Sequence, residues 1–551
     1  AGRLRKPCYI FKSPVINFSK KEWIGKVGGS FMMELVKKHI HMNRRRNSVM
    51  TQITLDDDFN VPDSMDDVEQ MILDSGEIQI ETVKNLGGRV TVGGKLNFRI
   101  LYRRPDGQLM TLAGSIPFEE QINVPELEET DYVQAGGELD DLHVGLINSR
   151  KLNVKALVTL TVQAETIFDV EAAADVTYDG DVETLKREIT AAAIAVRRKD
   201  TFRVRENLTL SANKPDIDHL LWQDIRLRGV DTKPLDGRIH IDGELMVFAV
   251  YSGEDGQMPV QCLEESIPFS GEVELAESLE GMIPFITVRL VHKDLEVSPD
   301  ADGEMRELTA DAVMELDIRL YEEQQTELLS DLYALDREIV LDTGEACFDT
   351  IAARNLVKTR IQEKLSLAGN QRILQICHCD GDLKLDEVQV KEDGLHIYGV
   401  LEVRLLYLTA DDGAPVSAAS EVLPFHMIAE VQGLKEDCIY QTAPGLEQIS
   451  AVMLGGDAVE LKAVISVDVL ILQPVCESVI LMVREEPLDK EKLKNMPGIV
   501  GYVVQPGDTL WKLARTFHTS VEEIMETNHL TESRIDPGDR LILVKKIELE
   551  K

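Results

Sequence analysis

The sequence predicts a multidomain, mainly β protein with three tandem β-sandwich-like repeats and a small C-terminal βααβ domain. A strand-like segment that begins with Gly and ends with Tyr occurs three times with identical internal spacing, at 94–102, 243–251 and 399–407. The segments recur about every 150 residues, the usual length of a whole domain. Self-similarity over such a long period indicates repeated domains rather than a short solenoid repeat.

Within each repeat the same elements follow in the same order. Turn residues and an Asp-Gly pair come after each Tyr, and Asp-Gly between two apolar runs is typical of a β-hairpin. An apolar-Pro-Phe triplet then opens the next predicted strand, at 116–118, 267–269 and 423–425. A further apolar strand ends each repeat, at 155–162, 311–318 and 462–469.

Side chains alternate along the Gly-to-Tyr strands, so one face is predicted to be core and the other polar. In the first repeat Leu96, Phe98 and Ile100 share one face and Arg99 lies opposite. In the second repeat the opposite face, which includes Phe248, is apolar as well. A neighbouring domain, a partner, or a local loop or helix would cover such a face.

Each repeat is expected to open with a strand and a short helix, the helices lying near 62–65 and 215–221. The expected boundaries are given by residue number in the following order: a basic N-terminal segment 1–46, repeat 1 at 47–168, a linker 169–199, repeat 2 at 200–325, a linker 326–355, repeat 3 at 356–485, a linker 486–500 and the small domain 501–546.

The segment 1–46 has twelve Lys and Arg residues against two Glu, in a chain whose formal net charge is -38. Runs of like charge are usually disordered tails, and disorder is the first interpretation. The second is that translation begins at Met32 or Met33, because the Gly28-Gly29 pair just upstream is what a ribosome-binding tract would encode.

Composition excludes several classes of protein. The 551 residues include 97 Asp and Glu against 59 Lys and Arg, so most surfaces repel phosphate backbones and a nucleic-acid partner is not expected. No apolar run approaches the 18 to 20 residues of a transmembrane helix, and no secretory signal is recognisable. Seven cysteines without a C-x-x-C pair predict a reducing compartment and no disulfide framework.

The C-terminal region predicts strand, helix, helix, strand. A strand from Tyr502 leads to a Pro506-Gly507 turn and a helix capped by Asp508 or Thr509. Ser520 and Glu523 form a capping box for a second helix, and a second strand covers 541–544.

The repeats resemble the SPOCS (spore coat assembly) domain of endospore-forming bacteria, which carries the Gly-led strand ending in Tyr and the Ile-Pro-Phe triplet. The C-terminal region resembles a LysM domain, by its 502–510 segment, Ala514, Asn528 and 535–538. The resemblance implies a groove for an N-acetylglucosamine glycan or a protein, formed by the following seven residues: Gly507, Asp508, Thr509, Leu510, Asn528, Leu530 and Ile535. Leu510, Ile535 and the turn and cap residues also have ordinary structural interpretations.

No catalytic motif is present, and neither a catalytic residue, a cofactor nor a metal site is predicted. Cys377-His378-Cys379 has no second ligand pair at zinc-site spacing, and alternation would place the two sulfurs on one face and His378 on the other.

The domain order is similar to the SipL/SpoVID class of spore-coat morphogenetic proteins. The resemblance implies a non-enzymatic scaffold in the mother-cell cytoplasm at the forespore surface, with the coat-basement ATPase and other spore-coat proteins as partners. An alternative stays open: a peptidoglycan-binding protein of the cell wall or spore cortex.

Overall fold

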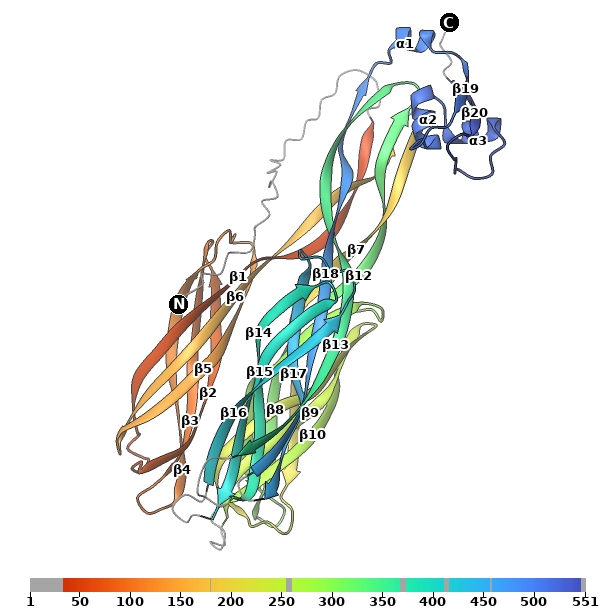
Figure 1. The fold of residues 1–551 in the computed structure, drawn as a ribbon. Coiled ribbons are helices and arrows are strands. Elements are labelled where there is room, and N and C mark those ends of the chain that lie inside the picture. The colour runs from red at the N-terminus through yellow and green to blue at the C-terminus, as the bar shows by residue number, and fades with distance from the viewer. Residues whose placement is uncertain are drawn as a thin grey trace.

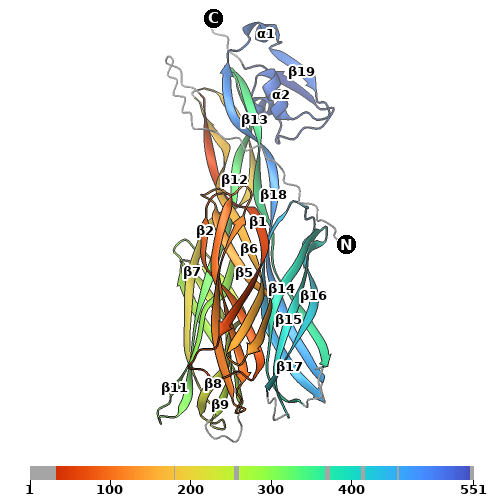
Figure 2. The same cartoon turned by 90° about the vertical axis from the view of Figure 1, so that its left-hand side faces the viewer.

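The computed structural model describes residues 33–178, 180–253, 260–366, 373–410, 416–455 and 458–546. The expectations for the start codon and for most of the basic segment concern residues outside these ranges. The described chain forms an elongated rod, with three β domains side by side at one end and the small C-terminal domain at the other (Figures 1 and 2).

Each repeat is a sandwich of two three-stranded antiparallel sheets, which confirms the predicted fold class. The first, fifth and sixth strands form one sheet of each repeat, and the second, third and fourth form the other. Repeat 1 comprises β1 (Glu34–Asn60), β2 (Gln70–Asn85), β3 (Arg89–Arg103), β4 (Leu109–Asn123), β5 (Tyr132–Asn148) and β6 (Lys151–Thr177). Repeat 2 comprises β7 (Val182–Thr209), β8 (Ile217–Leu235), β9 (Arg238–Gly253), β10 (Gln261–Glu274), β11 (Ile283–Pro299) and β12 (Met305–Ala334). Repeat 3 comprises β13 (Glu338–Ser366), β14 (Ile373–Lys391), β15 (Gly394–Thr409), β16 (Val416–Glu430), β17 (Ile439–Gly455) and β18 (Ala458–Glu486).

The repeated Gly and the repeated Phe are cross-strand partners. The three pairs are Gly94 with Phe118, Gly243 with Phe269 and Gly399 with Phe425. In each pair the Phe ring occupies the space of the missing side chain, and a Cβ on Gly399 would lie 2.7 Å from the ring of Phe425. An aromatic ring over a strand glycine fixes the register of the two strands, so the motif specifies the hairpin.

The first and last strands of each repeat continue beyond the sandwich and build a common stalk. Six strand extensions, two from each repeat, share hydrophobic clusters that include Ile40, Ala172, Ala193, Phe348 and Val479. The linkers expected at 169–199 and 326–355 were therefore wrong, because β6, β7, β12 and β13 occupy nearly all of those residues. Residues 34–46, expected in a disordered segment, likewise belong to β1. The apolar side chains of these strand extensions are buried only because the extensions of all three repeats pack together. The sequence of one repeat does not reveal that packing.

The three sandwiches close into a ring. β4 of repeat 1 contacts β8 of repeat 2, β10 of repeat 2 contacts β14 of repeat 3, and β16 of repeat 3 contacts β2 of repeat 1. Side chains of all three repeats meet in one cluster that includes Leu101, Trp222, Phe248 and Leu406. Phe248 and its neighbours are thus covered by the adjoining repeats, so of the alternatives left open for the apolar outer face of repeat 2 the structure shows the neighbouring domain.

A buried polar network lies where the ring passes into the stalk. Glu165 contacts Arg197 and, at 3.2 Å, Arg319, and all three side chains are at most 8% exposed. The Arg319 guanidinium also donates to Gln134 and Gln441, each at 3.0 Å. These residues come from all three repeats, so the network ties the repeats together at one level of the rod.

Two local expectations were wrong. Residues 62–65 form a turn closed by the Met65 N–H and the Pro62 carbonyl at 2.9 Å, and Ile217 already begins β8. The expected helices are therefore absent at those positions, because the chain there forms the turn at 62–65 and the start of β8.

A disulfide joins Cys347 to Cys476, which are directly opposite each other on β13 and β18 although 129 residues apart in sequence.

The C-terminal domain has the predicted βααβ order. It comprises β19 (Ile499–Val503), α2 (Leu510–Phe517), α3 (Val521–Thr527) and β20 (Arg540–Val544). The charged linker before it contains one short helix, α1 (Lys490–Asn495). Thr509 is the N-cap of α2 and accepts from the Lys512 N–H, and Ser520 caps α3 by accepting from the Glu523 N–H.

Candidate functional site

The predicted groove residues lie on two loops that backbone hydrogen bonds hold together. The β19–α2 loop carries residues 507–509, and the α3–β20 loop carries Leu530 and Ile535. Val504 connects them: its N–H donates to the Asp539 carbonyl, and its carbonyl accepts from the Gly538 N–H, each at 2.9 Å. Leu510, Leu530 and Ile535 pack in one hydrophobic cluster. The structure therefore brings the two predicted walls together.

Three of the predicted residues have structural partners that account for their side chains. The Asp508 carboxylate accepts from the Tyr502 hydroxyl at 2.9 Å and from the Gln505 N–H at 2.8 Å, which closes the turn. The hydrogen bond from the Tyr502 hydroxyl to the Asp508 carboxylate raises the pKa of Tyr502. Asn528 joins α3 to β20, since its amide donates to the Ile524 and Ile542 carbonyls and accepts from the Ile542 N–H. Leu510 is 2% exposed and belongs to the core.

The surface left for a ligand is therefore mostly backbone. Gly507 is exposed and has φ +90°, a conformation that favours glycine. Its carbonyl accepts from the Lys512 ammonium at 2.9 Å. Thr509 is exposed, but its hydroxyl caps α2. The role of these residues in ligand binding stays a prediction.

The domain is docked on the tip of the stalk, a contact that the sequence did not predict. The Asp331 carboxylate on β12 accepts from the Trp511 indole N–H at 2.8 Å and from Arg515 at 2.9 Å. The Tyr333 hydroxyl donates to the Thr519 carbonyl at 2.9 Å, and its ring meets Trp511 edge-on with centroids 4.9 Å apart.

The stalk tip is also part of the domain's hydrophobic core. Tyr333 and Leu335 lie in the same cluster as Leu513 and Ile524. Burial raises the pKa of Tyr333 above its ordinary range. A signal existed in the sequence: Trp511 lies outside the apolar face of α2, so its indole required another partner.

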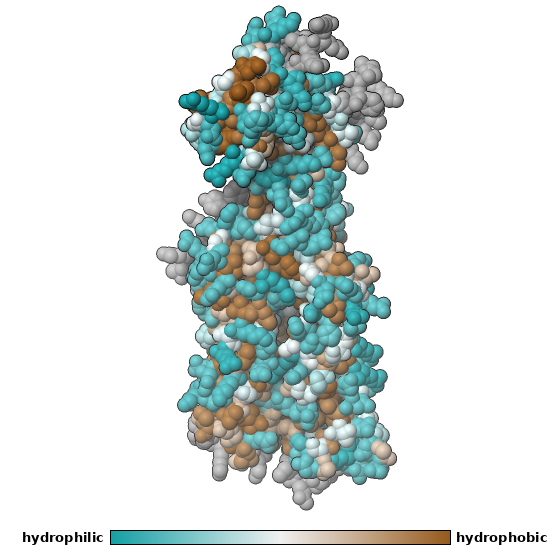
Figure 3. Space-filling model, turned by 90° about the vertical axis from the view of Figure 1, so that its right-hand side faces the viewer, coloured by the Kyte–Doolittle hydropathy of each residue, from teal (hydrophilic) through white to brown (hydrophobic). Residues whose placement is uncertain are grey.

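The docked arrangement leaves other surfaces of the domain free. Figure 3 shows apolar side chains among polar ones on the C-terminal domain at the upper end of the rod. Ile499, Val503 and Ile542, on the sheet β19–β20, are each at least 50% exposed.

The Cys377-His378-Cys379 segment does not have the predicted alternation. A β-bulge in β14 lies between residues 376 and 378, so Cys377 points into the ring interface and Cys379 into the core of repeat 3. His378 stacks on Phe248 with ring centroids 4.0 Å apart and pairs with Glu264 at 3.1 Å. Within the described ranges no group of three or more His, Cys, Asp or Glu side chains is arranged to hold a metal ion.

Comparisons with known proteins agree with this architecture. The family model "SipL, SPOCS domain" matches residues 67–147, 216–298 and 372–454, and the LysM domain model matches residues 502–544. A curated relative, the uncharacterized protein YkzQ of Bacillus subtilis (strain 168), is 46% identical over 37 residues, which are 7% of this chain. The chain covers 49% of that protein's length. No solved structure matches the chain.

Both families are binding modules rather than catalysts, and the SPOCS domain indicates a sporulation-related protein. In the described part of the chain no helix has the length and apolar character needed to cross a membrane. The chain therefore contains three tandem SPOCS domains followed by a C-terminal LysM domain.

Proposed function

We propose that the protein is a non-enzymatic scaffold of bacterial endospore coat assembly, and that its LysM domain attaches it to the forespore surface. The observation that carries the proposal is the combination of three SPOCS domains with one LysM domain in a single chain. The partners are the coat-basement ATPase, bound through the LysM domain, and other spore-coat proteins, bound through the SPOCS body. The site of action is the mother-cell cytoplasm at the forespore surface.

The shape of the molecule supports this role. The three sandwiches form one ring with a common stalk, and the LysM domain is docked at its far tip (Figure 1). A body of this kind holds its binding surfaces at fixed distances from one another. On a polymeric partner, several weak contacts of a rigid body combine into tight attachment.

Co-sedimentation tests the attachment. The full chain and a chain truncated after Pro497 are mixed with the polymerised coat-basement ATPase and centrifuged. The full chain is expected in the pellet and the truncated chain in the supernatant. Equal pelleting of both chains would contradict attachment through the LysM domain, and pelleting of neither would contradict this partner.

The alternative function is peptidoglycan binding, and the LysM family favours it. A groove lined largely by backbone groups suits a glycan as well as a protein. Insoluble peptidoglycan sacculi replace the polymer in the same assay. Retention of the full chain on sacculi, with loss on truncation, would support the alternative.

A further inference from the structure

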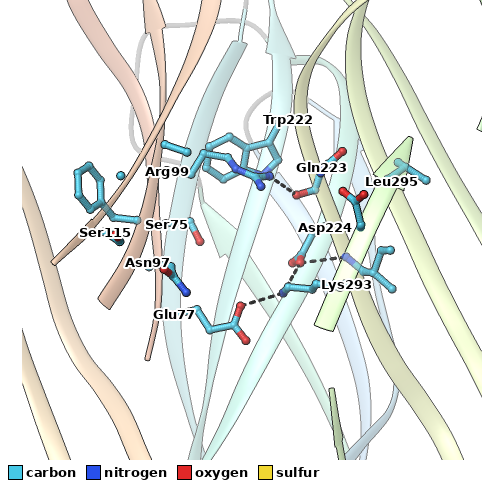
Figure 4. Close-up of a pocket in the computed structure, with 16 residues that line it drawn as sticks. Ser75, Glu77, Asn97, Arg99, Ser115, Trp222, Gln223, Asp224, Lys293 and Leu295 are labelled. Carbon is cyan, nitrogen blue, oxygen red and sulfur yellow. Dashed lines mark hydrogen bonds and ion pairs between the residues drawn. The ribbon is translucent and has the colours of Figure 1, made fainter. Parts of the chain in front are cut away.

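A polar cavity of about 460 Å³ lies between repeats 1 and 2, within the size range of small-ligand sites. Strands β2, β3 and β4 form one wall, and β8 and β11 form the other. Figure 4 shows Arg99 from repeat 1 beside Trp222 and Gln223 from repeat 2. Two domains therefore contribute to this one cavity.

Most charges around the cavity are compensated. The Lys293 ammonium lies 3.3 Å from Glu77 and 3.0 Å from Asp224 (Figure 4). Asp224 also pairs with Arg226 at 2.8 Å. Burial alone would raise the pKa of Asp224, but Arg226 and Lys293 outweigh it and hold the pKa far below its usual range. Glu77, Lys293, Asp224 and Arg226 are therefore linked by successive ion pairs, and each of these charges has a direct counterion.

Arg99 is different, because it forms no ion pair with any carboxylate of the described residues. Its guanidinium donates to the Gln223 carbonyl at 2.9 Å and lies 5.8 Å from the Trp222 ring centre. Burial lowers the pKa of Arg99, while Asp224, Asp294 and Glu77 act on it only through space. The positive charge is thus partly removed from water without a direct counterion.

The repeats provide an internal control for this interpretation. Arg99, Phe248 and Arg404 occupy the same position, five residues after the repeated Gly. Phe248 stacks on His378, and Arg404 pairs with Asp382 at 2.6 Å. In repeats 2 and 3 the side chain at this position therefore has a partner within the protein that matches its chemistry. In repeat 1, Arg99 has no such ion-pair or stacking partner of matching strength among the described residues.

Asp294 lines the opposite wall and is half-buried. Like Arg99, it has no ion-pair partner in the described part of the chain, and the two residues do not pair with each other. One cation and one anion, neither in a direct ion pair with another of the described residues, thus belong to facing walls of one cavity. Ser75 on β2 and Asn97 on β3 also line the cavity.

We propose that this cavity binds the zwitterionic head group of an α-amino acid, with its carboxylate on Arg99 and its ammonium on Asp294. A free amino acid and a longer molecule that ends in the same head group offer the same chemistry. Trp222, which also lines the cavity, can contact the aliphatic part of the ligand. The proposal is independent of the LysM domain and goes beyond the scaffold function.

Isothermal titration calorimetry on the full chain tests the site. Glycine represents a free amino acid, and diaminopimelate carries the same head group at the end of a longer chain. Acetate and methylammonium each supply one charge only. Saturable binding of glycine or diaminopimelate is expected, with acetate and methylammonium at least about tenfold weaker, because one charge-assisted hydrogen bond contributes that much.

Variants locate the binding. Arg99→Gln and Asp294→Asn should each weaken binding by about tenfold or more, and Arg99→Lys should retain part of it. The matched controls Arg89→Gln on β3 and Glu296→Gln on β11, both exposed, should bind like the wild type. Circular dichroism confirms that each variant is folded, and Arg99→Lys replaces Arg99→Gln if the latter unfolds. Absence of saturable binding at about 10 mM ligand, or binding unchanged in both Arg99 and Asp294 variants, would overturn the proposal.

Discussion

One carboxylate, Asp331, makes two of the polar contacts that dock the LysM domain on the stalk, and Asp331→Ala should weaken that docking. Asp331 accepts from the Trp511 indole and from Arg515. A hydrogen bond to a charged group contributes about 1.5 to 3 kcal/mol. The Arg515 side chain is 44% exposed, so its ion pair adds at most about 1 kcal/mol. Together these contacts favour docking by about 2 to 4 kcal/mol, a factor of about 30 to 700.

Hydrogen exchange and small-angle scattering measure the release. In the Asp331→Ala variant, amides near Tyr333 and Thr519 should exchange faster, since the docked surfaces are exposed more often. The radius of gyration should rise as the domain leaves the tip. The domain itself should stay folded, because its βααβ core includes Leu510, Leu513 and Ile524 from its own helices.

A second carboxylate on the same tip serves as the control. Asp336 accepts from the Tyr178 hydroxyl at 3.0 and 2.9 Å and pairs with Arg337, and both partners lie outside the LysM domain. Asp336→Ala should therefore leave exchange near Thr519 unchanged. If Asp331→Ala has the exchange pattern and radius of the wild type, the docking energy assigned to Asp331 is wrong.

Three further outcomes are expected. Gly399→Ala should lower the melting temperature, since a Cβ would lie 2.3 Å from a backbone carbonyl oxygen and 2.7 Å from the Phe425 ring. The expected loss of folding free energy is about 1 to 3 kcal/mol. Gly136→Ala is the matched control, because no atom lies within 4 Å of a Cβ at that position. Glu165→Gln should destabilise the ring by about 3 to 5 kcal/mol in urea unfolding, because it leaves buried arginines without their shared counterion; a change below about 1 kcal/mol would refute that role. The pKa of Asp224 is lowered in the folded state, so its stabilising contribution is complete above about pH 4 and is lost as the pH falls further; Asp224→Asn should flatten the acid limb of the stability profile, and an unchanged limb would contradict this.

Much of the fold was predictable because the repeat motif has a local cause. The Gly, the Phe and the turn between them specify one hairpin, and both Gly94 and Phe118 can be read directly from the sequence. The LysM domain was predictable for a similar reason, since Thr509 and Ser520 cap its helices locally.

The stalk and the docked LysM domain were not predictable in the same way. Ala172 and Ala193 are buried only because ribbons from different repeats meet, and small residues in a single ribbon do not indicate a core. The disulfide between Cys347 and Cys476 depends on a strand pairing across a whole repeat. Asp331 likewise gives no local sign that Trp511 contacts it.

The candidate groove was predictable as a location and only partly as chemistry. The LysM resemblance placed Gly507, Leu530 and Ile535 on two loops, and these loops are joined in the structure. It did not distinguish ligand contacts from structural ones, because Asp508 and Asn528 bond within the domain. Hydrogen bonds of that kind depend on the folded backbone.

Localisation in sporulating cells tests the central claim most directly. A fluorescent fusion of the chain started at Met33 is compared with the same fusion truncated after Pro497. The scaffold function predicts a ring of fluorescence around the forespore for the intact chain and diffuse mother-cell fluorescence for the truncated one. Fluorescence of the intact chain at the outer cell wall, or a forespore ring that survives truncation, would contradict attachment to the forespore through the LysM domain.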